Sequence, residues 1–198
     1  PLGMVDTGFA VPADQLHRLS AMYGLPDLIG ENYSAIQLVE AALAGFNERL
    51  DVSATYPTDT PHVFQRGGVG LFSTAADYMR FGQMLAAGGT LDGVRVVGRK
   101  TLELMHANHL PVGLLPYELM GLPNPGMGFG LGSRVMLDVA ATAGPGSAGE
   151  YGWAGAAKTY YWVDPAEELV GLFMSQNMTG VQLAERDLRS LVSQAIDD

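Results

Sequence analysis

Apolar residues recur at helical spacing in several parts of the chain. Between residues 75 and 87 the pattern is regular, with Ser73 or Thr74 placed as an N-cap and Gly88-Gly89 placed as a C-terminal stop. Weaker helical patterns cover residues 14–23, 36–50 and 99–107. A last helix is predicted from residue 179, because the following positions share one helical face: Val181, Ala184, Leu188, Leu191 and Ala195.

Strand patterns dominate the last third of the chain. Residues 129–139, 151–154, 159–163 and 168–175 are predicted strands, with a turn at Asp164-Pro165 and a flexible connector over 140–149. Residues 110–127 are rich in Gly, Pro, Leu and Met and predict a long loop that serves as a lid or pocket wall. Consecutive strands followed by an amphipathic helix predict an α+β fold, an antiparallel β-sheet flanked by helices.

This pattern divides residues 1–198 into three regions of one domain. Residues 1–66 form a helical and connector region, residues 67–109 form helices, and residues 110–198 form the sheet strands and the C-terminal helix. The composition supports a folded domain, since 47% of the 198 residues are hydrophobic and only 16% are charged.

The formal charge of −10, with only 11 Lys and Arg residues, argues against nucleic acid or an anionic membrane surface as a partner. No apolar run approaches the roughly 20 residues of a membrane span. The absence of Cys excludes disulfides and thiol chemistry.

Histidines and glycine-rich segments give weak signals for a bound metal or cofactor. His106 and His109 are three positions apart, but no third ligand is adjacent, so a surface or capping role is expected. His17 and His62 stand alone. The segments "GFGLGS" and "GGVGLFS" lack the Lys of a phosphate-binding loop. We therefore expect neither a metal nor a cofactor.

The segment "GWAGAAKTYYW", which begins at Gly152, is more informative. Glycines weaken a strand unless something must approach its backbone closely, and here Trp153-Ala154-Gly155 precedes two alanines. Bare N–H groups at a strand edge suit the stabilisation of an oxyanion. The alternative is an ordinary hairpin whose small residues fit beneath a loop.

Four phrases together resemble the serine β-lactamase-related family, which includes class C β-lactamases and family VIII esterases. They are "PLGMVDTGF" (1–9), "GGVGLFSTAADYMRFGQMLAAGG" (67–89), "MGFGLG" (127–132) and "YGWAGAAKTYYWVDP…LVGLFMSQ" (151–176). The resemblance implies a β-lactamase/transpeptidase-like fold. It also implies a site built from S-x-x-K, a motif such as Y-x-N, and K-T-G or a relative of it.

The resemblance places Trp153-Ala154-Gly155 at the third motif, where these three residues would bind substrate. The backbone N–H of Ala156 would then be one of two oxyanion donors, and the other would belong to the nucleophilic Ser. Lys158-Thr159 imitates the start of K-T-G, but it falls where the hairpin turns, so Lys158 receives no catalytic role.

The nucleophile is absent from these 198 residues. The two lysines, Lys100 and Lys158, have Val97 and Gly155 three positions earlier instead of Ser, and no Tyr-x-Asn occurs. In the family both motifs precede the "PLGM" phrase. The chain is therefore expected to be a C-terminal portion with an incomplete sheet, whose exposed edge is covered by the N-terminal segment of the same protein or by a dimer partner.

The expected function is that of a serine hydrolase acting on carboxylic esters through an acyl-enzyme, with weak β-lactamase activity as an extension. Trp153 favours an esterase, because the Lys of K-T-G normally binds the β-lactam carboxylate, and the loop 110–127 would shape the acyl pocket. The fragment alone is expected to be inactive. The alternatives are an acyltransferase and a non-catalytic penicillin-recognising module with a binding or structural role.

Overall fold

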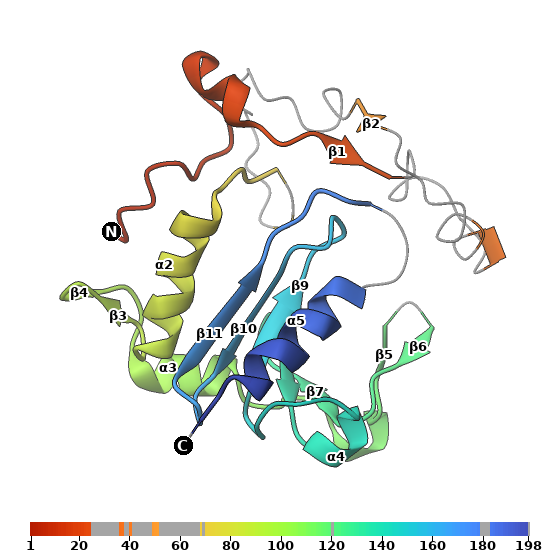
Figure 1. Ribbon diagram of the computed structural model, residues 1–198. Coiled ribbons are helices and arrows are strands. Elements are labelled where there is room, and N and C mark those ends of the chain that lie inside the picture. The colour runs from red at the N-terminus through yellow and green to blue at the C-terminus, as the bar shows by residue number, and fades with distance from the viewer. Residues whose placement is uncertain are drawn as a thin grey trace.

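A five-stranded antiparallel sheet forms the centre of the fold (Figure 1). The computed structural model describes residues 1–24, 36–37, 40, 49–51, 68, 70–119, 121–178 and 183–197. In the order β11-β10-β9-β8-β7, the strands span Leu169–Phe173, Tyr160–Asp164, Tyr151–Ala154, Arg134–Met136 and Met127–Phe129. Among the described strands, β11 pairs on one side only, with β10.

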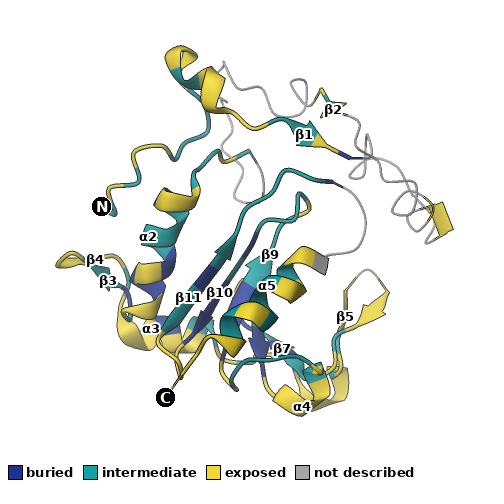
Figure 2. Ribbon diagram, in the orientation of Figure 1, coloured by how far each residue is buried: buried dark blue, intermediate teal, exposed yellow. Residues whose placement is uncertain are grey.

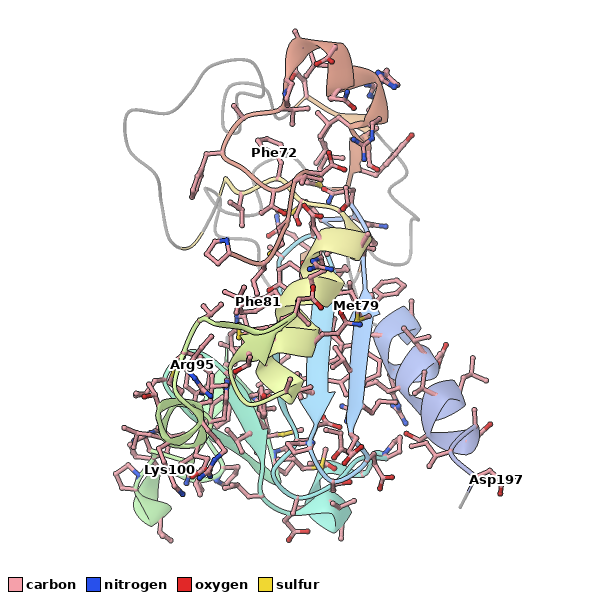
Figure 3. All side chains as sticks on the ribbon, turned by 90° about the vertical axis from the view of Figure 1, so that its left-hand side faces the viewer. Phe72, Met79, Phe81, Arg95, Lys100 and Asp197 are labelled. Atoms are coloured by element: carbon pink, nitrogen blue, oxygen red, sulfur yellow. The ribbon has the colours of Figure 1, made fainter. Side chains whose placement is uncertain are left out.

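Helices lie on both sides of this sheet (Figures 1 and 3). Helix α2 (Ala75–Ala86) packs against β10 and β11, and α5 (Leu183–Gln194) lies on the opposite side. The remaining described elements are short: η1 (Ala13–Arg18), β1 (Met22–Tyr23), β2 (Arg49–Leu50), β3 (Thr90–Leu91), β4 (Val94–Arg95), α3 (Arg99–Met105), η2 (Val112–Leu114), β5 (Glu118–Leu119), β6 (Leu122–Pro123) and α4 (Val139–Thr142). No helix in the described ranges is both long enough and apolar enough to cross a membrane.

Helix α2 has the boundaries that its sequence predicts. The Thr74 side chain accepts a hydrogen bond from the Asp77 amide at 3.2 Å, and Gly88 and Gly89 follow the helix with positive φ angles of 68° and 95°. Gly82 lies where α2 approaches the sheet, since a Cβ there would lie 2.6 Å from Val170 of β11. The helix therefore packs unusually close to the strand.

The main core lies between α2, α3 and the sheet (Figure 2). Its buried members come from two helices and three strands: Met84, Leu85, Leu102, Val135, Tyr151 and Val163. Burial of these side chains is the main favourable contribution to the fold, at about 1.5–3 kcal/mol for each large apolar group. The arrangement of strands and helices confirms the predicted α+β class, an antiparallel sheet flanked by helices.

Helix α5 docks on the sheet largely through charged groups, contrary to the predicted apolar face. Among the residues predicted for that face, Leu188 is half-buried, Leu191 is 63% exposed, and Val181 lies outside the described residues. Ala184 and Ala195 are exposed as well. The prediction was wrong because the helix instead turns Glu185 and Arg189 inward.

Two ion pairs hold these inward-facing groups. Glu185 pairs with Arg134 of β8 at 3.1 Å, and Arg189 pairs with Glu150, directly before β9, at 2.7 Å. The four side chains are between 4% and 20% exposed. Polar groups at such positions are tolerated because each has a hydrogen-bonded partner.

Other sequence predictions need correction. The single strand predicted over 129–139 is a hairpin of β7 and β8, closed by a hydrogen bond from the Gly130 amide to the Ser133 carbonyl at 2.8 Å. The predicted loop 110–127 contains η2 and the β5–β6 hairpin, and the connector 140–149 overlaps α4.

Two predictions for the N-terminal third of the chain can be compared with the structure only in part. The helix predicted over 14–23 is the shorter η1, which ends at Arg18 and is followed by β1. Most of the helix predicted over 36–50 and most of the connector 51–66 lie outside the described residues, but Leu50 belongs to β2.

Candidate active site

A three-residue turn joins β9 to β10 directly after the Trp-Ala-Gly segment. The Gly155 amide donates to the Thr159 carbonyl at 2.8 Å, and the Lys158 amide donates to the Gly155 carbonyl at 3.1 Å. Lys158 has a φ of 64°, in the left-handed region. This is the geometry of a type I turn followed by a left-handed residue, a common hairpin connection. Lys158 therefore lies in the turn, where the sequence placed it.

Ala156 occupies the first central position of this turn. The residue is exposed, and its backbone N–H has no hydrogen-bond partner within the described part of the chain. The turn hydrogen bonds fix the direction of the peptide on either side of it. An N–H group held in this way is available to an incoming acceptor without reorganising the backbone.

The glycines at 152 and 155 are needed mainly for close packing within the β9–β10 hairpin. A Cβ at Gly152 would lie 2.1 Å from the Tyr161 carbonyl oxygen, and one at Gly155 would lie 2.4 Å from the Thr159 hydroxyl. Both distances are far below van der Waals contact. The groups that approach these glycines closely are therefore residues of the same hairpin. The backbone N–H that is left for a ligand is that of Ala156 in the turn.

An open cavity of about 830 Å³ lies beside the segment that follows β11. It is lined by three segments that are distant in the sequence: residues 18–23, 73–75 and 174–177. Two of its lining residues bind the hairpin tip, since the Ser175 hydroxyl and the Asn177 amide donate to the Ala157 carbonyl at 2.8 and 3.2 Å. The hairpin tip that carries Ala156 is thus bonded to one wall of the cavity through the Ala157 carbonyl.

The N-terminal segment is fixed to α2 by the residues of the "PLGMVDTG" phrase. The Asp6 amide and the Thr7 hydroxyl donate to the buried Asp77 carboxylate at 2.7 and 2.8 Å. Arg18 then pairs with the Asp6 carboxylate at 2.6 Å, and its hydrogen bond lowers the pKa of Asp6. These contacts place Arg18 at the wall of the cavity.

Sequence reasoning did not identify Arg18, Ser73, Ser175 or Asn177 as residues of this region. Each is a common polar residue in an unremarkable local context. The only available signal was that the "PLGM" and "GGVGLFSTAADYM" segments both resemble the family. That resemblance does not predict that the two segments are in contact in the folded protein.

Three aromatic rings form a row beside β9. Trp153 contacts Phe129 of β7 edge to face, with ring centroids 5.1 Å apart. Phe129 contacts Tyr117 in the same manner at 5.9 Å. Tyr117 comes from the segment 110–127, so that segment reaches the third-motif strand through these rings.

The remaining titratable candidates lie in structural positions. Lys100 is 77% exposed, forms an ion pair with Glu103 and lies on α3 at the end of the sheet away from Phe72 (Figure 3). Burial lowers the pKa of Lys158. The Ser175 hydroxyl donates to the backbone carbonyl of Lys158 at 3.2 Å, but neither lysine follows a Ser by three positions as S-x-x-K requires.

His106 is the C-cap residue of α3, and its side chain packs inward. The sequence predicted a surface or capping role for this residue. Its ring stacks on Tyr151 at 3.6 Å, and its Nδ1 lies 2.8 Å from the Ser133 hydroxyl. Burial lowers the pKa of His106 to about 4, so the imidazole is neutral at pH 7. Within the described ranges, no three His, Asp or Glu side chains gather as a metal site would require.

Comparison with known proteins finds longer relatives. The chain is 37% identical over 183 residues to Protein Rv1367c of Mycobacterium tuberculosis, a match that covers 89% of this chain and 41% of the relative. The chain thus spans less than half the length of the relative it matches.

Solved structures resemble the fold in the same partial way. EstCE1, described as a hydrolase with promiscuous acyltransferase activity, superposes with a TM-score of 0.69 at 20% identity, covering 98% of this chain and 48% of that chain. A LovD6 mutant of simvastatin synthase from Aspergillus terreus gives a TM-score of 0.70 at 21% identity, with 98% and 47% coverage. At these identities the likeness shows the β-lactamase/transpeptidase-like fold alone.

The sequence provides the family assignment. The Beta-lactamase family model matches residues 1–196, from the "PLGM" phrase through the sheet to the end of α5. The chain therefore belongs to the beta-lactamase family.

Proposed function

We propose that this chain is the C-terminal part of a serine hydrolase that cleaves carboxylic esters through an acyl-enzyme. The observation that carries the proposal is the Ala156 amide. It is exposed, follows Trp153-Ala154-Gly155 directly, and lies on a hairpin tip bonded to the wall of an open cavity. A fixed backbone N–H of this kind stabilises the oxyanion that forms when an ester carbonyl is attacked.

The nucleophile and base belong, in this proposal, to an N-terminal segment of the same protein. Neither Lys100 nor Lys158 follows a Ser by three positions, and the matched relative is more than twice as long as the matched region. That segment would supply the acylated Ser, its Lys and the second oxyanion donor. Because nucleophile and base act as a unit, these 198 residues alone would not hydrolyse esters at a useful rate.

Esters are favoured over β-lactams by the residue at the start of the third motif. Trp153 stands where K-T-G would place an ammonium group to hold the β-lactam carboxylate. The guanidinium of Arg134 on β8 does not replace it, since it binds the Tyr160 hydroxyl and Glu185. In this proposal an apolar ring therefore occupies the position where a carboxylate substrate would need a cation.

Acyl transfer to an alcohol is the second candidate, because an acyl-enzyme can react with an alcohol as well as with water. It is favoured by the likeness to EstCE1 and to simvastatin synthase, at the level of fold only. Product analysis with an added alcohol separates the two, since transfer yields a new ester and hydrolysis yields the free acid.

The test removes the Ala156 N–H without changing the turn. Proline suits the first central position of a type I turn, so Ala156→Pro should fold normally while lacking the donor. In the full-length gene product we expect kcat for 4-nitrophenyl butyrate to fall roughly 10²–10³-fold, the usual cost of one oxyanion donor. Ala156→Gly keeps the N–H and is the matched control.

Two results would contradict the proposal. Unchanged hydrolysis by the folded Ala156→Pro variant would exclude this amide as an oxyanion donor. Full activity of the 198-residue chain without any further segment would show that its nucleophile is among the residues present.

A further inference from the structure

Tyr117, Phe129 and Trp153 form a row of aromatic rings close to the proposed oxyanion donor. Stabilisation of an oxyanion needs N–H groups and does not explain these rings. The rings come from three separate segments and meet edge to face at 5.9 and 5.1 Å. Each of the three residues is half-buried, so part of each remains accessible. Edge-to-face contacts hold the rings in defined orientations, which makes the row a preformed apolar surface.

The row begins close to the proposed reacting centre. Trp153 lies on β9 and Ala156 follows it by three residues, in the turn after that strand, so their backbones are no more than about 11 Å apart. This is the reach of a medium-length hydrocarbon chain. Phe129 and Tyr117 continue the surface away from β9 toward the segment 110–127.

The surroundings of the row are unsuited to a charged substrate group. The cation beside Tyr117 is Arg134, whose guanidinium binds Tyr160 and Glu185. The segment that carries Tyr117 instead exposes large apolar side chains, with Val112 87%, Leu114 60% and Leu122 70% exposed. The region therefore favours a hydrocarbon group over a carboxylate.

We propose that Tyr117, with Phe129 and Trp153, binds the hydrocarbon chain of the ester and that Tyr117 sets the length of chain that is bound best. This inference rests on the proposed ester hydrolysis and adds the substrate class, esters of medium-length apolar groups. The hydrocarbon chain can belong to the acid or to the alcohol of the ester, since the apolar surface would bind either one in the same way.

The ring of Tyr117 is the group that matters in this proposal, and its hydroxyl is not. Within the described residues the hydroxyl oxygen is buried without a hydrogen-bond partner, so it offers no donor to a substrate. Tyr117→Phe keeps the ring and removes that hydroxyl. Tyr117→Ala removes both, and the pair separates the ring from the polar group.

The experiment measures kcat/KM of the full-length gene product on two ester series. One series varies the acid from acetate to octanoate on 4-nitrophenol, and the other varies the alcohol from methanol to octanol on acetate. We expect Tyr117→Ala to lower kcat/KM roughly ten-fold for the long member of one series and to leave the short member unchanged. Glu118→Gln, a control at an exposed position on the same hairpin, should match the wild type, and Tyr117→Phe should keep the wild-type preference for chain length.

A binding measurement separates failure of this inference from failure of the proposed function. Calorimetry with 4-nitrophenyl octyl ether and 4-nitrophenyl ethyl ether needs no catalysis, and the octyl compound should bind more tightly in a Tyr117-dependent manner. If the protein hydrolysed no ester but still bound the octyl ether more tightly than the ethyl ether, the proposed function would be overturned and the apolar site supported. Equal effects of Tyr117→Ala on short and long chains, or equal affinity of the wild type for both ethers, would overturn the inference.

Discussion

Glu150 is expected to give this protein an unusual dependence of stability on pH. The residue is 4% exposed, and its two carboxylate oxygens each lie 2.7 Å from the Arg189 guanidinium. Burial raises its pKa from 4.5 to about 7, and the nearby Asp164 carboxylate acts in the same direction. The attraction of Arg189 and of Arg134 opposes this effect without cancelling it.

The sign of the effect follows from where the proton is bound. Between about pH 4.5 and pH 7 the folded protein holds a proton on Glu150 that the unfolded chain releases. The stability contributed by this proton is therefore fully present below pH 4.5 and is lost as the pH rises through about 7. The difference between the two pKa values corresponds to about 3 kcal/mol of unfolding free energy.

The assay compares wild type with Glu150→Gln by urea unfolding at about pH 5 and about pH 8. Glutamine retains the shape and an acceptor for Arg189 but does not titrate. We expect the wild type to lose about 2–3 kcal/mol relative to the variant between the two conditions, slightly less than the full difference because the unfolded chain is already partly protonated at pH 5. Glu167→Gln, at an exposed position in the β10–β11 turn, is the control and should run parallel to the wild type.

Parallel pH dependence of the wild type and Glu150→Gln would refute this reasoning. It would mean that Glu150 stays ionised when the protein folds, with Arg189 supplying enough attraction to offset burial. A wild type that gains stability relative to the variant on raising the pH would reverse the sign and lead to the same conclusion.

Two further variants test packing and the turn. Gly171→Ala would place a Cβ 2.0 Å from the Trp162 ring, and the overpacking should cost about 1–3 kcal/mol in urea unfolding; a neutral result would show that the ring moves freely. Lys158→Gly should stabilise the protein by about 1 kcal/mol, because Lys158 is held at a positive φ. The same variant should leave ester hydrolysis unchanged, and a large loss of kcat would give Lys158 a catalytic role.

Elements with local signals could be predicted from the sequence. The N-cap at Thr74 and the glycines at 88 and 89 define α2 through contacts within the helix itself. The strand over Tyr151–Ala154 has its predicted boundaries as well. In contrast, the turn at Gly130–Ser133 was missed, because apolar residues on both sides of it were assigned to one continuous strand.

The face of α5 could not be predicted, for a different physical reason. Hydrophobic periodicity assumes that charged side chains face water, and Glu185 and Arg189 do not. Their partners, Arg134 and Glu150, lie at least 39 residues away in the sequence. Only the folded sheet brings these charges together.

The candidate site divides in the same way. Trp153 and Ala156 were found because their short segment resembles a motif. The cavity was not found, because Arg18 and Ser175 reach it from opposite ends of the chain. A motif carries local information, whereas a cavity depends on how distant segments fold together.

Hydrogen bonds that connect the N-terminal segment with the hairpin tip have a consequence for local opening. The Tyr23 amide donates to Gln176 at 2.8 Å, the Met178 amide donates to Tyr23 at 2.7 Å, and the Asn177 amide donates to Ala157. Segments linked in this manner tend to open as one cooperative unit in hydrogen exchange. The amides of Tyr23, Asn177 and Met178 should therefore show a common free energy of opening, and loss of the first 23 residues should lower the protection of Asn177 and Met178.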